Sequence, residues 1–223
     1  DNDGVITWEL MVERLNSDLA NTLGNLVNRT ISMSNKYFDG VVTNTGVAEE
    51  VDEDLKAVVL GTADKVSAKM DQLRVADAMT EIFALFKRCN KYIDETMPWA
   101  LAKDEAKKDR LATVLYNLVE GISIGASLLE SFMPETAQKV VAQLNTTLRS
   151  LDDTKTFGLY PSGNKVVEKP EILFARLDVN EVLEKVAEKK AAEEAANHVP
   201  TVEIEPYATE DIDFDTFCKS DFR

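Results

Sequence analysis

Two polar side chains on the first predicted helix have the types and spacing needed to read nucleic-acid bases. Asn25 and Arg29 are four residues apart, so a helix places them one above the other on one face. An amide and a guanidinium held in this way can hydrogen-bond the edges of bases. The alternative is a solvated helix face whose Asn side chains bond locally. The same polar stripe continues through Asp18, Asn21, Asn28 and Ser32.

A second candidate is Pro98-Trp99, at the break between the third and fourth predicted helices. Proline fixes the local backbone, so we expect the tryptophan to stay outside the helix interfaces and to offer a flat face. Stacking of an indole on an unpaired base is worth about 1–3 kcal/mol. Lys and Arg residues are frequent between Lys87 and Arg110, although nearby acids partly offset them. The alternative is a tryptophan that caps the end of the bundle, among charges paired along their helices.

Other kinds of chemistry have little support in the sequence. The chain has one histidine, His198, and two distant cysteines, Cys89 and Cys218. These counts exclude a His-rich or Cys-rich metal site and a disulfide framework, and they argue against Ser-His-Asp or Cys-His catalysis. There is also no glycine-rich phosphate loop. We therefore expect no catalytic, cofactor-binding or metal-binding residue in these 223 residues.

Composition limits the partners. Forty acids against 25 bases give a net charge of −15 and a pI near 4.5, whereas nucleic-acid binders usually have a pI above about 9. Any RNA contact must therefore be local, and we expect no DNA partner. No apolar run approaches the roughly 18 residues of a membrane span, so we expect no membrane contact and a cytoplasmic location.

Apolar periodicity predicts an all-α fold. Glycine and proline are scarce before residue 157, while Ala, Leu, Val, Lys and Glu are frequent. A first helix should begin after Thr7 as its N-cap and reach Tyr37, with an apolar stripe of Met11, Leu15, Leu19, Leu23 and Leu26. Gly121 and Gly125 indicate close helix approach. Four further helices are predicted over 51–70, 75–94, 104–132 and 134–144.

The later part of the chain changes character, which predicts four regions. Residues 1–150 form the bundle and 151–177 a loop. A charged spacer helix covers 178–197, and 198–223 form an acidic tail. Because the chain opens on Asp1 and carries no signal segment, we expect it to be a piece of a longer protein.

Four segments, in order, resemble one family. They are Arg14–Arg29 (RLNSDLANTLGNLVNR), NKYI at 90–93 with PWALAK at 98–103, KPEILFAR at 169–176, and IDFDTFCKSDFR at 212–223. The first two resemble signatures of the anticodon-binding domain of methionyl-tRNA synthetases, a helical bundle of the class I type. The third resembles the segment that returns toward the catalytic domain, where the family usually has proline in place of Ala175. The fourth resembles the first strand of an appended OB-fold tRNA-binding domain.

The resemblance implies a function for each matched residue. Asn25, Arg29 and Trp99 would recognise the CAU anticodon, with Pro98 shaping the position of the tryptophan. The partners would be elongator and initiator methionine tRNAs and the protein's own catalytic domain. That domain would use ATP and Mg, often with Zn. Its HIGH-like and KMSKS-like motifs do not occur here, so we expect no activity and no cofactor in this chain alone. We expect this chain to be a monomer, and the parent enzyme to dimerise, if it does, through the appended domain.

The rival hypothesis is a non-catalytic helical-bundle protein-interaction domain that does not bind RNA. The acidic charge favours this rival. The two hypotheses differ in one structural expectation: anticodon recognition requires Trp99, Asn25 and Arg29 to meet on one exposed patch, whereas the rival allows Trp99 to be buried against the fourth helix.

Overall fold

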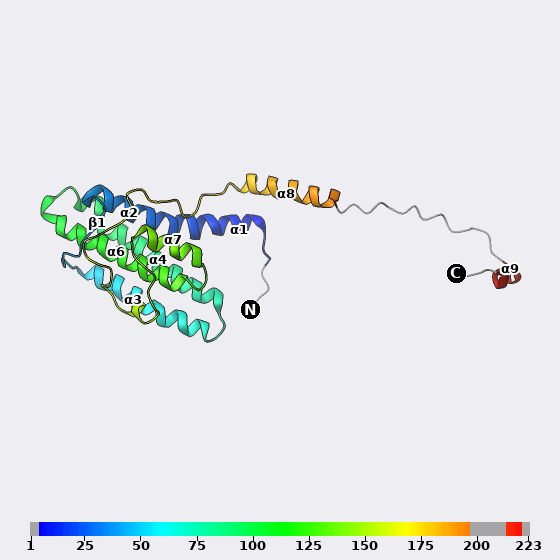
Figure 1. Ribbon diagram of the computed structural model, residues 1–223, viewed down its shortest axis with the longest axis horizontal. Coiled ribbons are helices and arrows are strands. Elements are labelled where there is room, and N and C mark those ends of the chain that lie inside the picture. Colours follow the sequence, from blue (N-terminus) through cyan, green and yellow to red (C-terminus); the bar gives the residue numbers. More distant parts are fainter. Residues whose placement is uncertain (1–4, 197–212, 220–223) are drawn as a thin grey trace. The chain divides into compact units, whose positions relative to one another are not determined.

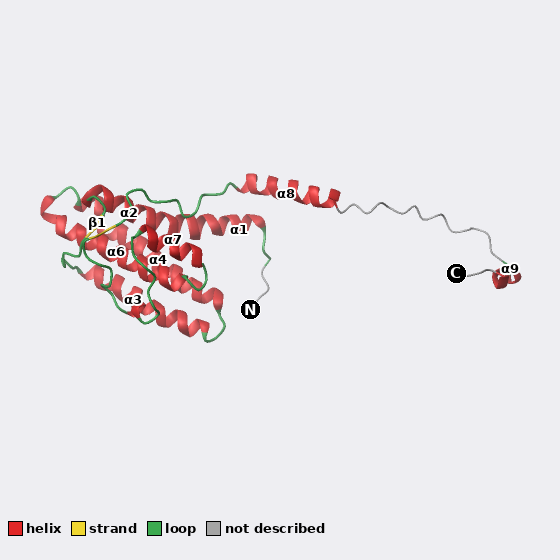
Figure 2. Cartoon of the chain, viewed as in Figure 1, coloured by secondary structure: helices red, strands yellow, loops and turns green. Residues whose placement is uncertain are grey.

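A computed structural model of the chain describes residues 5–196 and 213–219, and the described residues are almost wholly helical (Figures 1 and 2). The chain divides into residues 1–183 and residues 184–223, with the division inside α8. The longer elements are α1 (Trp8–Arg14), the π-helix η1 (Leu15–Gly24), α2 (Asn25–Phe38), α3 (Glu50–Met70), α4 (Val75–Thr96), α6 (Lys108–Leu129), α7 (Pro134–Gln143) and α8 (Val179–Ala196). The short ones are α5 (Pro98–Leu101), η2 (Glu105–Lys107), η3 (Asp153–Lys155) and α9 (Phe214–Lys219), with strands β1 (Val41–Val42) and β2 (Asn164–Lys165).

The predicted all-α class is confirmed, and most predicted helices agree with observed ones to within a few residues. Thr7 caps α1 as expected, because its hydroxyl accepts a hydrogen bond from the Leu10 N–H at 3.2 Å. Pro134 occupies the first turn of α7, where its missing N–H has no helical partner to lose. The short helix α5 was not predicted. The strands form one antiparallel two-residue ribbon, in which Val41 lies opposite Lys165 and Val42 opposite Asn164.

The first helix differs from its prediction in one physically important way. It runs through to Phe38, but its middle ten residues form a π-helix, which has i→i+5 hydrogen bonds. A π-turn holds more residues than an α-turn, so the apolar face shifts along the helix. Met11, the first residue of the predicted apolar stripe, is 43% exposed, whereas its neighbour Val12 is buried.

The helix α6 lies at the centre of the bundle and contacts α2, α3, α4 and α7 (Figure 1). Every residue from Arg110 to Leu129 is buried. The stretch Glu105–Leu129 is long and apolar enough to cross a membrane, but its apolar window lies entirely inside the bundle. The predicted close approach at its glycines is confirmed, because a Cβ at Gly121 would lie 2.9 Å from the Cys89 Sγ.

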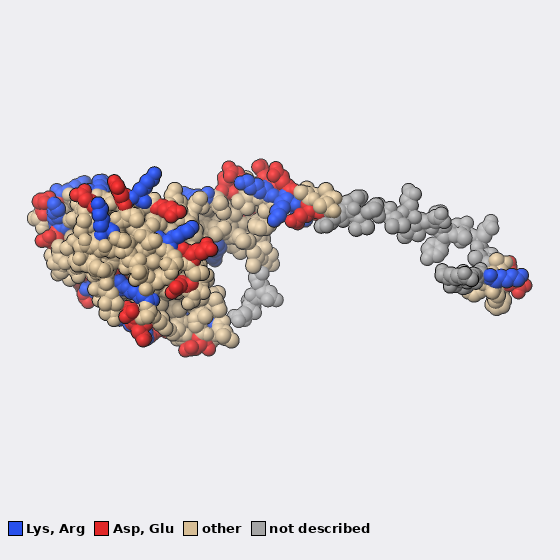
Figure 3. Space-filling view, viewed as in Figure 1, with Lys and Arg blue, Asp and Glu red and all other residues tan. Residues whose placement is uncertain are grey.

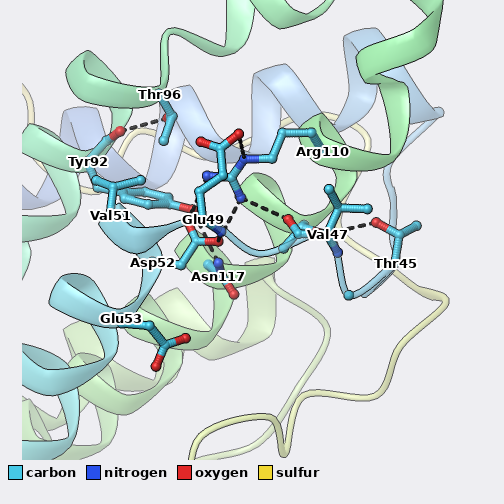
Figure 4. A network of polar contacts seen from close by, with 12 residues as sticks. Thr45, Val47, Glu49, Val51, Asp52, Glu53, Tyr92, Thr96, Arg110 and Asn117 are labelled. Carbon is cyan, nitrogen blue, oxygen red and sulfur yellow. Dashed lines mark hydrogen bonds and ion pairs between the residues drawn. The ribbon is translucent and has the colours of Figure 1, made fainter.

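A buried ion pair holds α3, α4 and α6 together (Figure 4). Asp52 in the first turn of α3 is fully buried and accepts two hydrogen bonds from Arg110 of α6, at 2.7 and 2.8 Å. The Tyr92 hydroxyl of α4 donates a third at 2.6 Å, and the Glu49 N–H donates a fourth at 2.9 Å. Asn117 of α6 donates in turn to the Tyr92 oxygen at 3.2 Å. Burial would raise the pKa of Asp52, but these donors hold it below its usual 3.8.

A second buried pair fixes the chain that follows the bundle. Glu120 of α6 accepts both Arg149 guanidinium nitrogens at 2.9 Å and also accepts the Tyr160 N–H. The Tyr116 hydroxyl donates to the Tyr160 carbonyl at 2.8 Å. The segment from Arg149 to Tyr160 is thereby fastened to the central helix.

The structure of the C-terminal residues differs from what the resemblance implied. Where the resemblance implied the first strand of an OB-fold, residues Phe214–Lys219 form the helix α9. Asp213 explains its start, because its carboxylate accepts the Thr216 N–H at 3.0 Å as an N-cap does. The remaining residues of that predicted strand, and most of the predicted tail from 198, lie outside the described residues. The charged helix α8, predicted over 178–197, is present and has no buried residue.

Loss of the Asp52 charge should strongly destabilise the bundle. In Asp52→Asn the buried Arg110 guanidinium would keep only the exposed Glu49 carboxylate, 3.3 Å from its Nε, as a counter-charge. We therefore expect the free energy of unfolding in urea to fall by about 3–5 kcal/mol. The matched control is Asp64→Asn, whose carboxylate pairs with Lys155 at the surface and should contribute at most about 1 kcal/mol. Equal effects of the two substitutions would contradict the role given to the buried pair.

The same pair predicts a pH dependence. The pKa of Asp52 in the folded state lies below 3.8, so its charge stabilises the fold at higher pH, and this contribution is lost as the pH falls through the folded value. The difference in unfolding free energy between wild type and Asp52→Asn should be constant above about pH 5 and should shrink below pH 3.8. Urea titrations from pH 3 to pH 7 measure it, and a difference that stays constant over that range would refute the assignment.

Candidate nucleic-acid interface

Asn25 and Arg29 lie on successive turns at the start of α2, as predicted. Asn25 stands at the junction between the π-helix and α2, and its backbone N–H donates to the Ala20 carbonyl five residues earlier. Its side chain is exposed and has no hydrogen-bond partner among the described residues. Arg29 is half-buried, and one of its guanidinium nitrogens lies 3.8 Å from the Asp94 carboxylate of α4.

The corner between α4 and α5 presents Trp99. Met97 ends α4 in the left-handed region, with φ 43° and ψ 65°, and its carbonyl accepts the N–H groups of Ala100 and Leu101. Pro98 is buried at the first position of α5, where its fixed φ suits a helix start. Trp99 is 43% exposed. The indole is therefore carried on a rigid turn and is open to solvent.

The helix α2 borders this corner along its length. Near its start, Arg29 approaches Asp94, five residues before Trp99. At its other end, Lys36 and Phe38 line a small cavity of about 160 Å³ together with Leu101, two residues after Trp99. The structure thus brings Arg29 beside the segment that leads to Pro98 and Trp99, and Asn25 lies one turn before Arg29 on α2.

Hydrogen bonds fix both elements that carry these residues. Asn90 of α4 donates to the Thr22 carbonyl of the π-helix at 3.0 Å, so α4 is tied directly to the segment before Asn25. Tyr92, held by Asp52, accepts at its carbonyl the hydroxyl of Thr96, the last residue of α4, at 2.7 Å. The buried ion pair described above therefore fixes the end of α4 from which Trp99 follows.

Charges near the corner divide into paired and free groups. Arg88 and Lys91 both pair with Glu95, at 2.8 and 3.3 Å. Lys103 and Lys107, which follow Trp99, are exposed and have no carboxylate partner within 5–196 or 213–219. Figure 3 shows Lys and Arg side chains over this end of the bundle, interspersed with acids. Residues 87–110 carry seven bases and five acids, so this part of the chain is less acidic than the chain as a whole.

The segment after β2 lies along η1 and α2, on the same side as Asn25. Its two ends are held by side-chain amides, because Asn35 donates to the Val167 and Glu168 carbonyls at 2.9 and 3.0 Å, and Asn16 exchanges two hydrogen bonds with the Leu177 backbone. The sequence predicted a loop over 151–177, but it did not predict that Asn35 and Asn16 hold the two ends of this segment. The only signal available was the recurrence of Asn along the first helix.

The described residues hold no group placed to bind a metal, and the Cys89 thiol is buried. Over 5–196 and 213–219, no group of three or more His, Cys, Asp or Glu side chains is placed to hold a metal ion. Burial raises the pKa of the Cys89 thiol to about 12, so it stays protonated in the core.

Comparison with known proteins gives the family. Residues 42–195 match the family model described as the anticodon binding domain of methionyl tRNA ligase. The chain belongs to this family. It is 46% identical to the methionine–tRNA ligase of Caldanaerobacter subterraneus over 211 residues, which is 92% of this chain and 33% of that protein. It is 43% identical to that of Clostridium perfringens over 223 residues, which is 100% of this chain and 34% of that protein.

A solved structure agrees with this assignment to the methionyl tRNA ligase family. The free form of Mycobacterium tuberculosis methionyl-tRNA synthetase superposes with a TM-score of 0.74 and 33% identity, over 79% of this chain and 36% of that one. The chain thus spans about a third of the length of its relatives. Pro98 and Trp99 lie within the residues matched by the family model. Asn25 and Arg29 precede residue 42 and lie outside that match, but the alignment with the Clostridium relative includes them.

Removing one anchor should loosen the return segment without unfolding the bundle. In Asn16→Ala the Leu177 N–H loses its acceptor and its carbonyl loses its donor. We expect hydrogen exchange at the Leu177 amide to accelerate at least tenfold, while exchange in α6 stays unchanged. Asn180→Ala is the matched control, because that exposed side chain on α8 has no hydrogen-bond partner in the described part of the chain. Unchanged exchange at Leu177 would show that Asn16 is not an anchor.

Proposed function

We propose that this chain recognises the CAU anticodon of methionine tRNAs, both elongator and initiator, as part of a methionine–tRNA ligase. The observation that carries the proposal is the exposed Trp99 on a rigid corner that Arg29 and α2 border. Family membership supports it, because the matching family is that of anticodon binding domains.

The geometry suits an RNA loop. Sequence-specific RNA recognition targets single-stranded loops whose bases can be splayed out and stacked on aromatic side chains. Trp99 would stack the first anticodon base, and Pro98 would hold the indole at its exposed position. Asn25, whose amide is unoccupied, and Arg29 would hydrogen-bond the edges of the bases that this unstacking exposes.

The pairing of Arg29 with Asp94 is compatible with this role. The two groups are 3.8 Å apart and the Asp94 carboxylate is 70% exposed, so the pair contributes little stability. It orients the guanidinium toward the corner without consuming its hydrogen bonds. RNA can therefore replace Asp94 at a small free-energy cost.

The rest of the proposal concerns the whole enzyme. Attachment of methionine to tRNA, with its ATP, Mg and often Zn, would reside in the parts of the relatives that this chain does not span. The chain alone would be catalytically inactive. It would act in the cytoplasm as a monomer, with any dimerisation of the parent enzyme through an appended domain.

Tryptophan fluorescence tests the proposal. The chain is titrated with an RNA hairpin whose loop carries CAU and with one whose first anticodon base is changed. Trp8 is replaced by Phe in every protein, because it is 48% exposed and adds background. In the Trp8→Phe protein we expect quenching with the CAU hairpin only. Adding Trp99→Ala leaves no tryptophan, so the affinity of that variant is measured from the anisotropy of a dye-labelled hairpin. We expect it to be roughly 5- to 150-fold weaker, since stacking is worth about 1–3 kcal/mol.

If Trp99→Phe, which keeps a smaller ring, retains part of the affinity for the CAU hairpin, this would support stacking. Equal binding of both hairpins, or wild-type affinity in Trp99→Ala, would contradict anticodon reading and return the protein-interaction hypothesis to first place.

A further inference from the structure

The segment NKYI at 90–93 resembles a family signature but has no direct part in the proposed base contacts. Its first residue, Asn90, is half-buried on α4. The amide nitrogen of Asn90 donates two hydrogen bonds, one to the Thr22 carbonyl of η1 at 3.0 Å and one to the Phe86 carbonyl of its own helix at 3.2 Å. One side chain therefore fixes a turn of η1 against α4.

The helix η1 has an uncommon backbone at this point. Hydrogen bonding of the i→i+5 type usually lasts a single turn and is frequent at functional sites. Here it covers ten residues, Leu15–Gly24. The Thr22 hydroxyl follows the same spacing, since it donates to the Ser17 carbonyl five residues earlier at 3.0 Å. Thr22 thus lies where the π-turns end, three residues before Asn25.

Contacts from two directions support these turns. From the segment after β2, Arg176 donates to the Asn21 side chain and the Leu177 backbone exchanges hydrogen bonds with Asn16. From the packed bundle, Asn90 donates to the Thr22 carbonyl. A donor from outside a helix draws a carbonyl away from the N–H groups of its own helix, which favours a widened turn. The Asn90 amide is therefore placed to hold the π-turn that precedes the base-reading residues.

We infer that Asn90 is a positioning residue for anticodon reading: it holds the last π-turn and thereby sets the direction in which Asn25 and Arg29 project. The inference rests on the proposed function, because it assigns no RNA contact to Asn90 itself. Successive residues of an α-helix are rotated by about 100° about its axis. A shift of one residue in the π-turns would therefore turn Asn25 and Arg29 away from the face they now occupy.

Trp99 is held by a different set of contacts. The end of α4 that precedes it is fixed through the Tyr92 hydroxyl, which donates to Asp52 at 2.6 Å. Loss of the Asn90 amide should therefore impair reading of base edges by the α2 residues and leave stacking on Trp99 in place. A general loss of structure would reduce both.

Binding of RNA hairpins tests this separation in the Trp8→Phe protein. Asn90→Ala removes both hydrogen bonds of the amide. The Kd of the CAU hairpin is compared with those of hairpins changed at the second or third anticodon base, using the anisotropy of a dye-labelled RNA. We expect the ratio of these Kd values to fall roughly two- to tenfold, as for loss of one base-edge hydrogen bond. Quenching of Trp99 by a saturating amount of the CAU hairpin should stay unchanged.

Thr80→Ala is the matched control on α4. The Thr80 hydroxyl donates to the Ala76 carbonyl of its own helix at 2.9 Å, so its loss removes a hydrogen bond from α4 without touching η1. This variant should discriminate between the hairpins as the parent does. Equal loss of discrimination in Thr80→Ala and Asn90→Ala would overturn the inference.

A double-mutant cycle tests whether Asn90 acts through Asn25. Asn25→Ala should reduce discrimination in the parent protein but should add little to the loss already present in Asn90→Ala, because both variants remove the same contact. Losses that multiply in the double variant would mean that Asn90 affects binding by another route, and would overturn its role as a positioning residue.

Hydrogen exchange tests the same turn without RNA. The Asn25 N–H bonds the Ala20 carbonyl five residues earlier, and its exchange should accelerate at least tenfold in Asn90→Ala while exchange in α6 stays unchanged. Thr22→Val, which keeps the shape of Thr22 but loses the hydroxyl bond to Ser17, should shift exchange and discrimination in the same direction. It decides the question should Asn90→Ala fail to fold. Parent-like exchange and discrimination in both variants would contradict the inference.

These outcomes are separable from those of the proposed function. If Trp99→Ala loses affinity for the CAU hairpin while Asn90→Ala discriminates as the parent does, anticodon reading stands and the positioning role fails. If the parent does not distinguish CAU from its variants, the proposed function fails and the positioning role fails with it.

Discussion

The structure depends most on one buried carboxylate. Asp52 is withdrawn from water, which alone would favour its neutral form, and only the convergence of Arg110, Tyr92 and the Glu49 N–H keeps it charged. Because each donor comes from a different part of the chain, the carboxylate fixes the mutual positions of α3, α4 and α6. The last turns of α4 are fixed with it, and the corner that carries Trp99 starts there. An interaction inside the core thus determines the geometry of a surface.

A strongly acidic chain repels RNA, so the proposed RNA binding depends on where its cations lie. Most arginines are held by carboxylates, and these pairs hold elements together rather than project positive charge. Among the described cations without such a partner, Lys103 and Lys107 follow Trp99, and Arg176 lies beside Asn25. Long-range attraction is therefore weak, and affinity must come from short-range stacking and hydrogen bonds.

The parts of this fold that were predictable from sequence are those set by local rules. Apolar spacing located the helices, Thr7 and Pro134 marked two of their starts, and the i,i+4 spacing placed Asn25 above Arg29. The π-helix was not predictable, because it depends on which carbonyls find side-chain partners, such as the Thr22 carbonyl with Asn90. Arg176 meets Asn21 across 155 residues, and no local pattern encodes that contact.

The π-helix also explains how the return segment affects the reading face. Asn25 is the first residue after the π-turns, so any change in their register would rotate Asn25 and Arg29 about the helix axis. π-turns are rare, and they persist only where neighbouring groups satisfy the displaced backbone. Here Asn90 acts from α4, while Asn16 and Asn21 fasten the return segment across the same turns. The direction in which Asn25 points is therefore set jointly by three segments that are distant in sequence, and a change in any of them would alter the position of a residue proposed to read bases.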